Sequence, residues 1–144
     1  MPPVRPAARL DVAPLAPSGP KRVILVEDSP LYAETWRAVL ACRYGPRVSF
    51  EHVQEAAEAG SHLGPDVTLL LVDIDVPDGE GIRLVEHAQA QGVTARRIVV
   101  LSARHADELH ALFPPASCLA VINKTDPQQQ NAFLMILDSI VKRH

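Results

Sequence analysis

The sequence predicts an α/β protein in which helices cover both faces of a parallel β-sheet. Short apolar runs of strand type alternate with helical patterns from residue 22 onward, and such alternation is typical of βαβ units. A length of 144 residues and an apolar content of 47% suit one domain with one core. We therefore expect one doubly wound (βα)5 domain, a three-layer sandwich with a five-stranded parallel sheet and a ligand crevice where the strands end.

Apolar runs and capping residues define the elements of the N-terminal half. We expect strands over 22–27, 48–53 and 67–73, and helices over 30–43, 54–63 and 80–91. Asp28 and Ser29 offer capping side chains before Pro30, an order that favours a helix start. The third strand contains the most apolar run of the chain and ends at Asp73.

The elements of the C-terminal half follow the same pattern. We expect strands over 97–102 and 118–123, and helices over 104–113 and 127–142. Asp126 precedes Pro127 and caps the last helix in the same way. That helix carries an apolar stripe that we expect to face the core, namely Phe133, Ile136, Leu137, Ile140 and Val141. Leu134 and Met135 are then left to face outward.

Residues 1–20 differ in composition from the rest of the chain. They contain six of the 13 prolines, with alanines between them, and this prevents both a helix and a central strand. We interpret this segment as a Pro/Ala-rich N-terminal tail and place the folded domain at 21–144.

Charge and composition exclude several classes of partner. The 14 basic and 17 acidic residues give a net charge of -3, without the basic excess typical of direct nucleic-acid binding. The apolar runs are much shorter than the roughly 20 residues that cross a bilayer, so we expect no membrane contact. Cys42 and Cys118 form no CxxC pair, and we interpret them as reduced core thiols of a cytoplasmic protein.

Chemically active side chains fall at the ends of four predicted strands. Glu27 ends the first strand and Asp28 follows it, Asp73 ends the third, Ser102 ends the fourth and Lys124 follows the fifth. Carboxylates that converge on one crevice repel one another unless a hard cation neutralises them, and oxygen ligands select Mg²⁺. The sequence therefore predicts a magnesium site at this edge of the sheet.

The same residues suit phosphoryl transfer. Asp73 can act as the nucleophile and form an aspartyl phosphate, while Lys124 balances the charge of the phosphoryl oxygens. The hydroxyl of Ser102 can donate to a further phosphoryl oxygen. These three residues are the candidate catalytic residues.

The set of motifs resembles the receiver domain of two-component response regulators. The resemblance covers residues 22–144 and rests on Val26-Glu27-Asp28-Ser29, Asp73-Ile74-Asp75-Val76-Pro77 with Gly81, Ser102-Ala103 and Asn123-Lys124. It implies a flavodoxin-like fold with strand order 2-1-3-4-5. It also implies a signalling protein rather than an enzyme, with at most magnesium-dependent self-phosphorylation and autodephosphorylation.

The resemblance implies a role for each matching residue. Asp73 would receive a phosphoryl group from a histidine kinase or a phosphotransfer protein, and Ser102 and Lys124 would bind that group. The implied magnesium ligands are the Asp28 and Asp73 carboxylates, Glu27 through water and the backbone carbonyl of Asp75. Phosphorylation would change the surface of the fourth helix, fifth strand and fifth helix, which would contact a downstream protein or an output domain. We also hypothesise a homodimer through this surface.

The sequence departs from the family pattern at one position in the fifth strand and at another just after it. Val121 stands where many members have an aromatic switch residue, and Thr125 follows the lysine in place of the frequent proline. Asp75 and Arg104 occupy positions that in this family flank the route of attacking water. We hypothesise that they form an ion pair that slows hydrolysis of phosphorylated Asp73.

Two other functions are compatible with the motifs. In a phosphatase of the haloacid-dehalogenase type, Asp73 would be the nucleophile and Asp75 the general acid, but the acidic metal pair would lie after the lysine, where only Asp126 and Asp138 are found. In a phosphate-independent interaction module, the departures that matter would be Glu27, which replaces the usual aspartate, and Val121. A stand-alone regulator and a fragment of a longer regulator both fit the sequence.

Overall fold

Five strands form one fully parallel sheet in the computed structural model, which describes residues 19–75, 81–104, 106–114 and 116–142. The strands are β1 (Lys21–Val26), β2 (Val48–Val53), β3 (Leu69–Asp73), β4 (Ile98–Ser102) and β5 (Ala120–Asn123). Their order across the sheet is β2-β1-β3-β4-β5, which confirms the predicted fold class. The tail predicted over 1–20 lies outside the described residues except for its last two positions.

Five α-helices connect and follow these strands. They are α1 (Pro30–Tyr44), α2 (Ala56–Ala59), α3 (Gly81–Ala90), α4 (Ala106–Leu112) and α5 (Pro127–Lys142). The helix expected over 54–63 is shorter than predicted, because after one α-helical turn the chain continues as the 3-10 helix Gly60–His62. Glycine and serine are weak helix formers, and the sequence Gly60-Ser61 stands where the α-helix ends.

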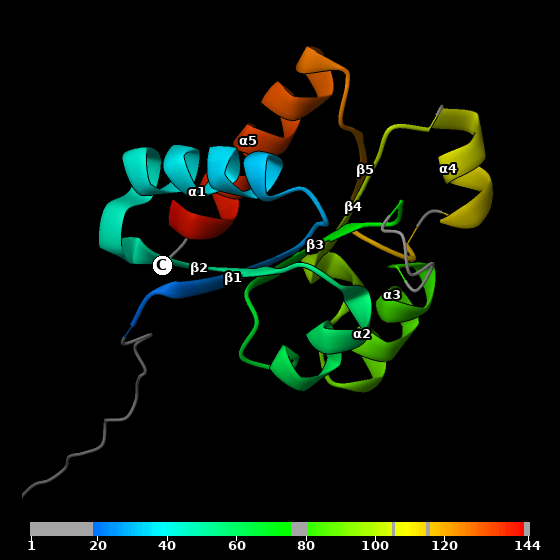
Figure 1. Cartoon of the computed structure of the whole chain (residues 1–144), viewed down its shortest axis with the longest axis horizontal. Coiled ribbons are helices and arrows are strands. Elements are labelled where there is room, and N and C mark those ends of the chain that lie inside the picture. The colour runs from blue at the N-terminus through cyan, green and yellow to red at the C-terminus, as the bar shows by residue number, and fades with distance from the viewer. Residues whose placement is uncertain (1–18, 76–80, 105, 115, 143–144) are drawn as a thin grey trace, which may run out of the picture.

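The helices lie in two layers on opposite faces of the sheet (Figure 1). Alternate strand residues point to opposite faces, so Val23 and Leu25 pack with α1 and α5, whereas Ile24 and Val26 pack with α2 and α3. The described part of the chain contains no helix that is long and apolar enough to span a membrane.

The first helix begins as the capping pattern predicts. The Ser29 hydroxyl accepts a hydrogen bond from the backbone N–H of Tyr32 at 3.2 Å, and Pro30 occupies the first turn. Its buried face includes Trp36 and Leu40, which leaves Cys42 on the exposed face. The expectation that Cys42 is a core thiol is therefore wrong, because two residues past Leu40 the helix points its side chain away from the sheet.

The last helix packs on the sheet with a stripe rotated slightly from the one predicted. Phe133, Leu137 and Val141 are buried, Leu134 packs against the same core, and Ile136 instead lines a surface groove. With 3.6 residues per turn, Leu134 lies nearer than Ile136 to the centre of the buried stripe. The assignments of these two residues are therefore exchanged.

Candidate functional site

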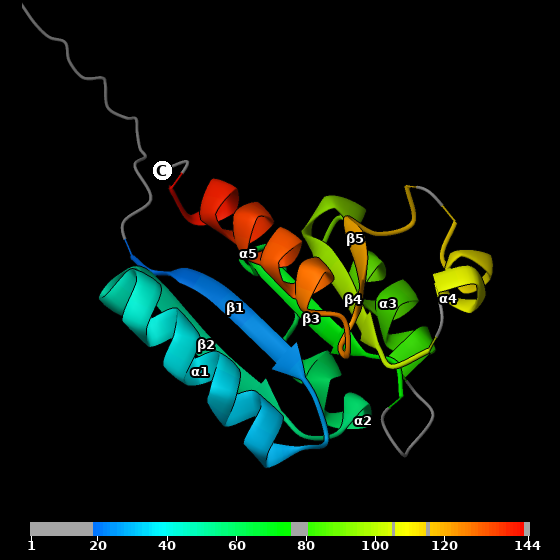
Figure 2. The ribbon, with the colours of Figure 1, turned by 90° about the horizontal axis from the view of Figure 1, so that it is seen from above.

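The parallel order brings the ends of the strands to one edge of the sheet (Figure 2). The candidate residues lie at these strand ends. Glu27 and Asp28 follow β1, which lies beside β3 and its last residue Asp73. Ser102 ends β4, and Lys124 follows β5 directly. The backbone N–H of Lys124 donates to the carbonyl of Ser102 at 2.9 Å, so the sheet itself sets the positions of these two residues.

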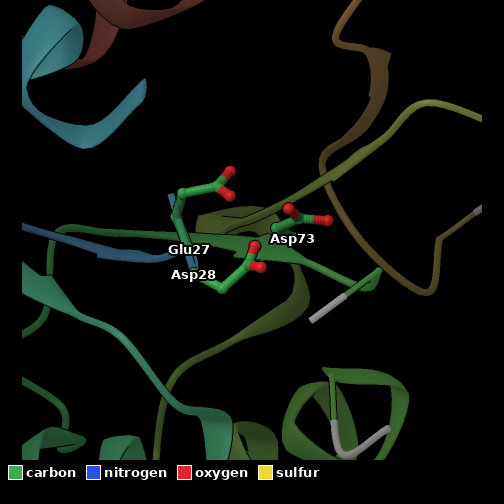
Figure 3. A group of neighbouring side chains, drawn as sticks. All are labelled: Glu27, Asp28 and Asp73. Carbon is green, nitrogen blue, oxygen red and sulfur yellow. The ribbon is translucent and has the colours of Figure 1, made fainter. Parts of the chain in front are cut away.

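Three carboxylates meet at the centre of this edge. One carboxylate oxygen from each of Glu27, Asp28 and Asp73 lies within 4.8 Å of the other two, and Figure 3 shows the three side chains gathered where β1 and β3 end. Glu27 and Asp73 are only 1% and 2% exposed. Buried like charges at this distance are unfavourable unless an opposite charge compensates them.

Lys124 supplies part of that compensation. Its Nζ donates to Glu27 Oε2 at 2.6 Å and to Asp73 Oδ2 at 2.9 Å. Burial raises the pKa of Glu27 to about 7, against the lowering effect of the Lys124 hydrogen bond. Burial lowers the pKa of Lys124, but the hydrogen bonds to the two carboxylates outweigh it and leave that pKa raised. Lys124 is therefore a fixed positive charge beside Asp73.

Tyr32 is a site neighbour that the sequence motifs do not include. Its ring centroid lies 4.3 Å from Lys124 Nζ, a distance at which a cation is attracted to the face of an aromatic ring. Burial raises the pKa of its hydroxyl. Its place in the first turn after the acidic pair was the available signal.

The end of β3 is tightly built around Asp73. Asp73 Oδ1 accepts a hydrogen bond from the backbone N–H of Asp75 at 2.8 Å, while its other oxygen faces Lys124. At Gly81 the first turn of α3 approaches this strand end so closely that a Cβ would lie 2.7 Å from the Cα of Ile74. Glycine is therefore required there, while Val76 and Pro77 of the same motif lie outside the described residues.

The Asp75 carboxylate turns toward the loop after β4. Its Oδ2 accepts from Ser102 Oγ at 2.8 Å and from the backbone N–H of Ala103 at 3.0 Å. Its Oδ1 pairs with Arg104 Nε at 3.0 Å, so the predicted Asp75–Arg104 ion pair is present. Its effect on hydrolysis stays a prediction.

Asn123 is a second residue whose part sequence reasoning did not foresee. Its side-chain amide donates to the carbonyl of Arg104 at 3.1 Å, and its side-chain oxygen accepts from both the backbone and the hydroxyl of Thr125. It thus ties the loop after β4 to the loop that carries Lys124. Its position before the lysine was the only sequence signal.

The donor set fits a hard divalent cation. The three clustered side chains offer only carboxylate oxygens, the ligand type that Mg²⁺ prefers. With Lys124 as the only cation bonded to them among the described residues, the cluster keeps an excess of negative charge. The Asp75 carboxylate is not part of this cluster, and a ligand role of its backbone carbonyl stays a prediction.

The acids that a phosphatase of the haloacid-dehalogenase type would need lie elsewhere. Asp126 accepts from the backbone N–H of Gln128 and caps α5, and Asp138 accepts from the hydroxyl of Tyr44 at 2.5 Å. Neither belongs to the carboxylate cluster. The described residues therefore do not form the acidic metal pair that a phosphatase of this type would have after the lysine.

Comparison with known proteins identifies the fold. No family model and no curated protein matches the sequence. A receiver domain from Methanospirillum hungatei has a TM-score of 0.69 at 20% identity and covers 84% of this chain and 94% of its own. A phosphorylated cyanobacterial phytochrome response regulator has 0.68 at 20%, covering 87% and 96%. A two-component response regulator from Clostridium difficile has 0.69 at 14%, covering 85% and 97%.

Proposed function

We propose that this chain, whose fold is that of response regulator receiver domains, accepts a phosphoryl group on Asp73 in a two-component phosphorelay. The observation that carries the proposal is the buried centre at the strand ends. Three carboxylates lie within 4.8 Å of one another, and one lysine is hydrogen-bonded to two of them. This arrangement offers a nucleophile, a cation site and a fixed positive charge in one place.

Magnesium would be held by the carboxylates of Asp28 and Asp73, by Glu27 through water and by the Asp75 carbonyl. When bound, the metal supplies positive charge that offsets the phosphoryl oxygens. The excess negative charge of the cluster supports this assignment, since each phosphoryl group brings further negative charge to the same place.

The donor in this proposal is a phosphohistidine of a histidine kinase or phosphotransfer protein. An Asp73 oxygen attacks phosphorus, the new P–O bond forms, and the P–N bond breaks with its electron pair returning to the histidine nitrogen. Lys124, already bonded to Asp73 at 2.9 Å, balances the charge on the phosphoryl oxygens. The Ser102 hydroxyl donates to another of these oxygens.

The signal would leave through the surface of α4, β5 and α5 toward a downstream protein or output domain. Apolar side chains exposed there support a contact surface, with Met135 74%, Leu112 41% and Leu119 37% exposed. We propose a homodimer through this surface, and light scattering that finds a monomer with and without a phosphoryl analogue would exclude it. The proposal retains the expected cytoplasmic location and needs neither membrane nor direct nucleic-acid contact.

Incubation with acetyl phosphate tests the proposed function. We expect intact-mass spectrometry to detect one added phosphoryl group that requires magnesium and is lost in Asp73→Asn. Asp138→Asn is the matched control, because Asp138 lies in α5 and bonds to Tyr44, and this variant should be labelled like the wild type.

The alternative functions give different results in the same assay. Absence of labelling under conditions that label a known receiver would favour the phosphate-independent interaction module. Glu27 and Val121 would then be the first residues to replace by those usual in the family, an aspartate and an aromatic residue. Multiple turnover of a phosphomonoester, with phosphate release that depends on Asp75, would favour the phosphatase.

A further inference from the structure

One carboxylate holds three consecutive residues of the loop that leads from β4 toward α4. Asp75 accepts from the Ser102 hydroxyl at 2.8 Å and from the Ala103 amide at 3.0 Å, and it pairs with Arg104 Nε at 3.0 Å. Asp75 belongs to the turn after β3, two residues past the proposed phosphoacceptor. The contacts therefore join the phosphoacceptor strand directly to the neighbouring loop.

The hydroxyl of Ser102 is fully engaged in this arrangement. Its single O–H donates to Asp75, its oxygen accepts from the backbone N–H of Arg104 at 3.0 Å, and the residue is 0% exposed. A serine hydroxyl has only one proton to donate. It cannot make a full hydrogen bond to Asp75 and to a phosphoryl oxygen at the same time.

We propose that the Asp75 carboxylate is a latch that holds Ser102 and its loop in the resting state and competes with the phosphoryl group for the Ser102 hydroxyl. The inference rests on the proposed function. Binding of the phosphoryl group would take the O–H from Asp75 and release one of the three contacts that fix the loop. Asn123, which donates to the Arg104 carbonyl at 3.1 Å, connects this change to β5 and thus to the proposed output surface.

The exposure of Asp75 makes the latch releasable. The Asp75 side chain is 31% exposed, so a water molecule can replace the Ser102 hydroxyl as its hydrogen-bond donor. The contacts of Asp75 with Ala103 and Arg104 can remain when the Ser102 hydrogen bond breaks. A hydrogen bond to a charged group that can be replaced by water makes a modest net contribution. Removal of the acceptor should therefore raise the affinity for a phosphoryl analogue by about tenfold, since the resting competitor is gone.

Titration calorimetry with beryllofluoride and magnesium tests the latch. Asp75→Ala should bind about tenfold more tightly than the wild type. Arg104→Ala is the matched control, because it removes the outer partner of Asp75 and leaves the Ser102 bond in place, and it should change affinity much less. Thermal unfolding of each variant checks that it is folded.

The same Asp75 substitution in a Ser102→Ala variant distinguishes the latch from a general effect of charge. A general effect of charge would raise the affinity for an anionic ligand equally in both backgrounds, whereas the latch acts only through the Ser102 hydroxyl. In Ser102→Ala, further substitution of Asp75 should therefore raise the affinity much less than it does in the wild type. Without metal or ligand, amide hydrogen exchange at Ala103 should be faster in Asp75→Ala, since its acceptor is lost.

The outcomes distinguish the latch from the function on which it rests. No beryllofluoride binding by the wild type would overturn the proposed function and the latch together. Binding by the wild type with no gain in Asp75→Ala, or with an equal gain in the Ser102→Ala background, would overturn the latch alone. A gain that requires Ser102 would support it.

Discussion

Two sites in this molecule each join one basic side chain to two carboxylates, and they differ mainly in burial. In the first, the Arg22 cluster, Arg22 pairs with Glu51 at 2.5 Å and Asp66 at 3.1 Å, and the three side chains are 25%, 31% and 72% exposed. In the second, the Lys124 cluster, the lysine side chain is 19% exposed, and the side chains of its partners Glu27 and Asp73 are only 1% and 3% exposed. Each basic side chain thus pairs with two carboxylates, and Asp28 adds a third carboxylate beside the Lys124 cluster.

The two clusters shift a glutamate pKa in opposite directions. The Arg22 hydrogen bond is the main cause that lowers the pKa of Glu51, whereas burial is the main cause that raises the pKa of Glu27 to about 7. Desolvation penalises the charged form of a carboxyl group. A single cation therefore stabilises the carboxylate charge in the exposed cluster, but it does not offset the cost of burial in the Lys124 cluster. The Lys124 cluster is therefore left with uncompensated negative charge, which is consistent with the proposed magnesium site.

Removal of the basic side chain should produce the largest difference in stability between the two clusters. Lys124→Met keeps an apolar stem but leaves Glu27 and Asp73 buried without their partner, and we expect a loss of about 3 kcal/mol in the free energy of unfolding at pH 8 without metal. Arg22→Met is the matched change in the exposed cluster and should cost at most about 1 kcal/mol. Urea unfolding measures both, and equal losses would contradict the role assigned to burial.

Neutralisation of the glutamate in each cluster should change the free energy of unfolding by a smaller amount and with opposite sign in the two clusters. The folded-state pKa of Glu27 is raised to about 7, so its charge penalises the folded state fully above that pH and not below its ordinary pKa. The stability that protonated Glu27 contributes to the folded state is therefore lost as pH rises from the ordinary glutamate pKa toward 7. Glu27→Gln should raise the free energy of unfolding by about 2 kcal/mol at pH 8 without metal, and change it little at pH 5. Urea unfolding at the two pH values measures the difference.

Glu51→Gln provides the control of opposite sign. The pKa of Glu51 is lowered, so its ionised form contributes stability above its ordinary pKa and loses it as pH falls. The variant should lose up to about 1 kcal/mol at pH 8, as expected for a partly exposed ion pair. If Glu27→Gln were also destabilising at pH 8, the Lys124 hydrogen bond would outweigh burial, which would contradict the raised pKa of Glu27.

The framework of the site could be predicted because it depends on local patterns. An apolar run that ends in an acid places that acid at a strand end, and the parallel order then brings Glu27, Asp73 and Lys124 to the same edge. No knowledge of side-chain conformation is needed for that step. The Asp75–Arg104 pair was expected from the positions of the two residues in the family pattern, and it is present.

The remaining features depend on side-chain direction and long-range packing. The sequence does not reveal that the Asp75 carboxylate accepts from Ser102, because several rotamers of Asp75 are compatible with its position. It also does not reveal that the Tyr32 ring lies beside Lys124, since these residues are 92 positions apart. The exchange of Leu134 and Ile136 in α5 arises from a helix rotation that only the packed core determines.

The most direct test of the central claim is the location of the covalent label. After treatment with acetyl phosphate and magnesium, borohydride converts an aspartyl phosphate into homoserine, which peptide mass spectrometry locates by residue. We expect conversion at Asp73 alone, with the partly exposed Glu51 and the exposed Asp66 of the Arg22 cluster unchanged. Conversion at those surface carboxylates, or none at Asp73, would contradict the claim that the buried cluster is the phosphoryl acceptor.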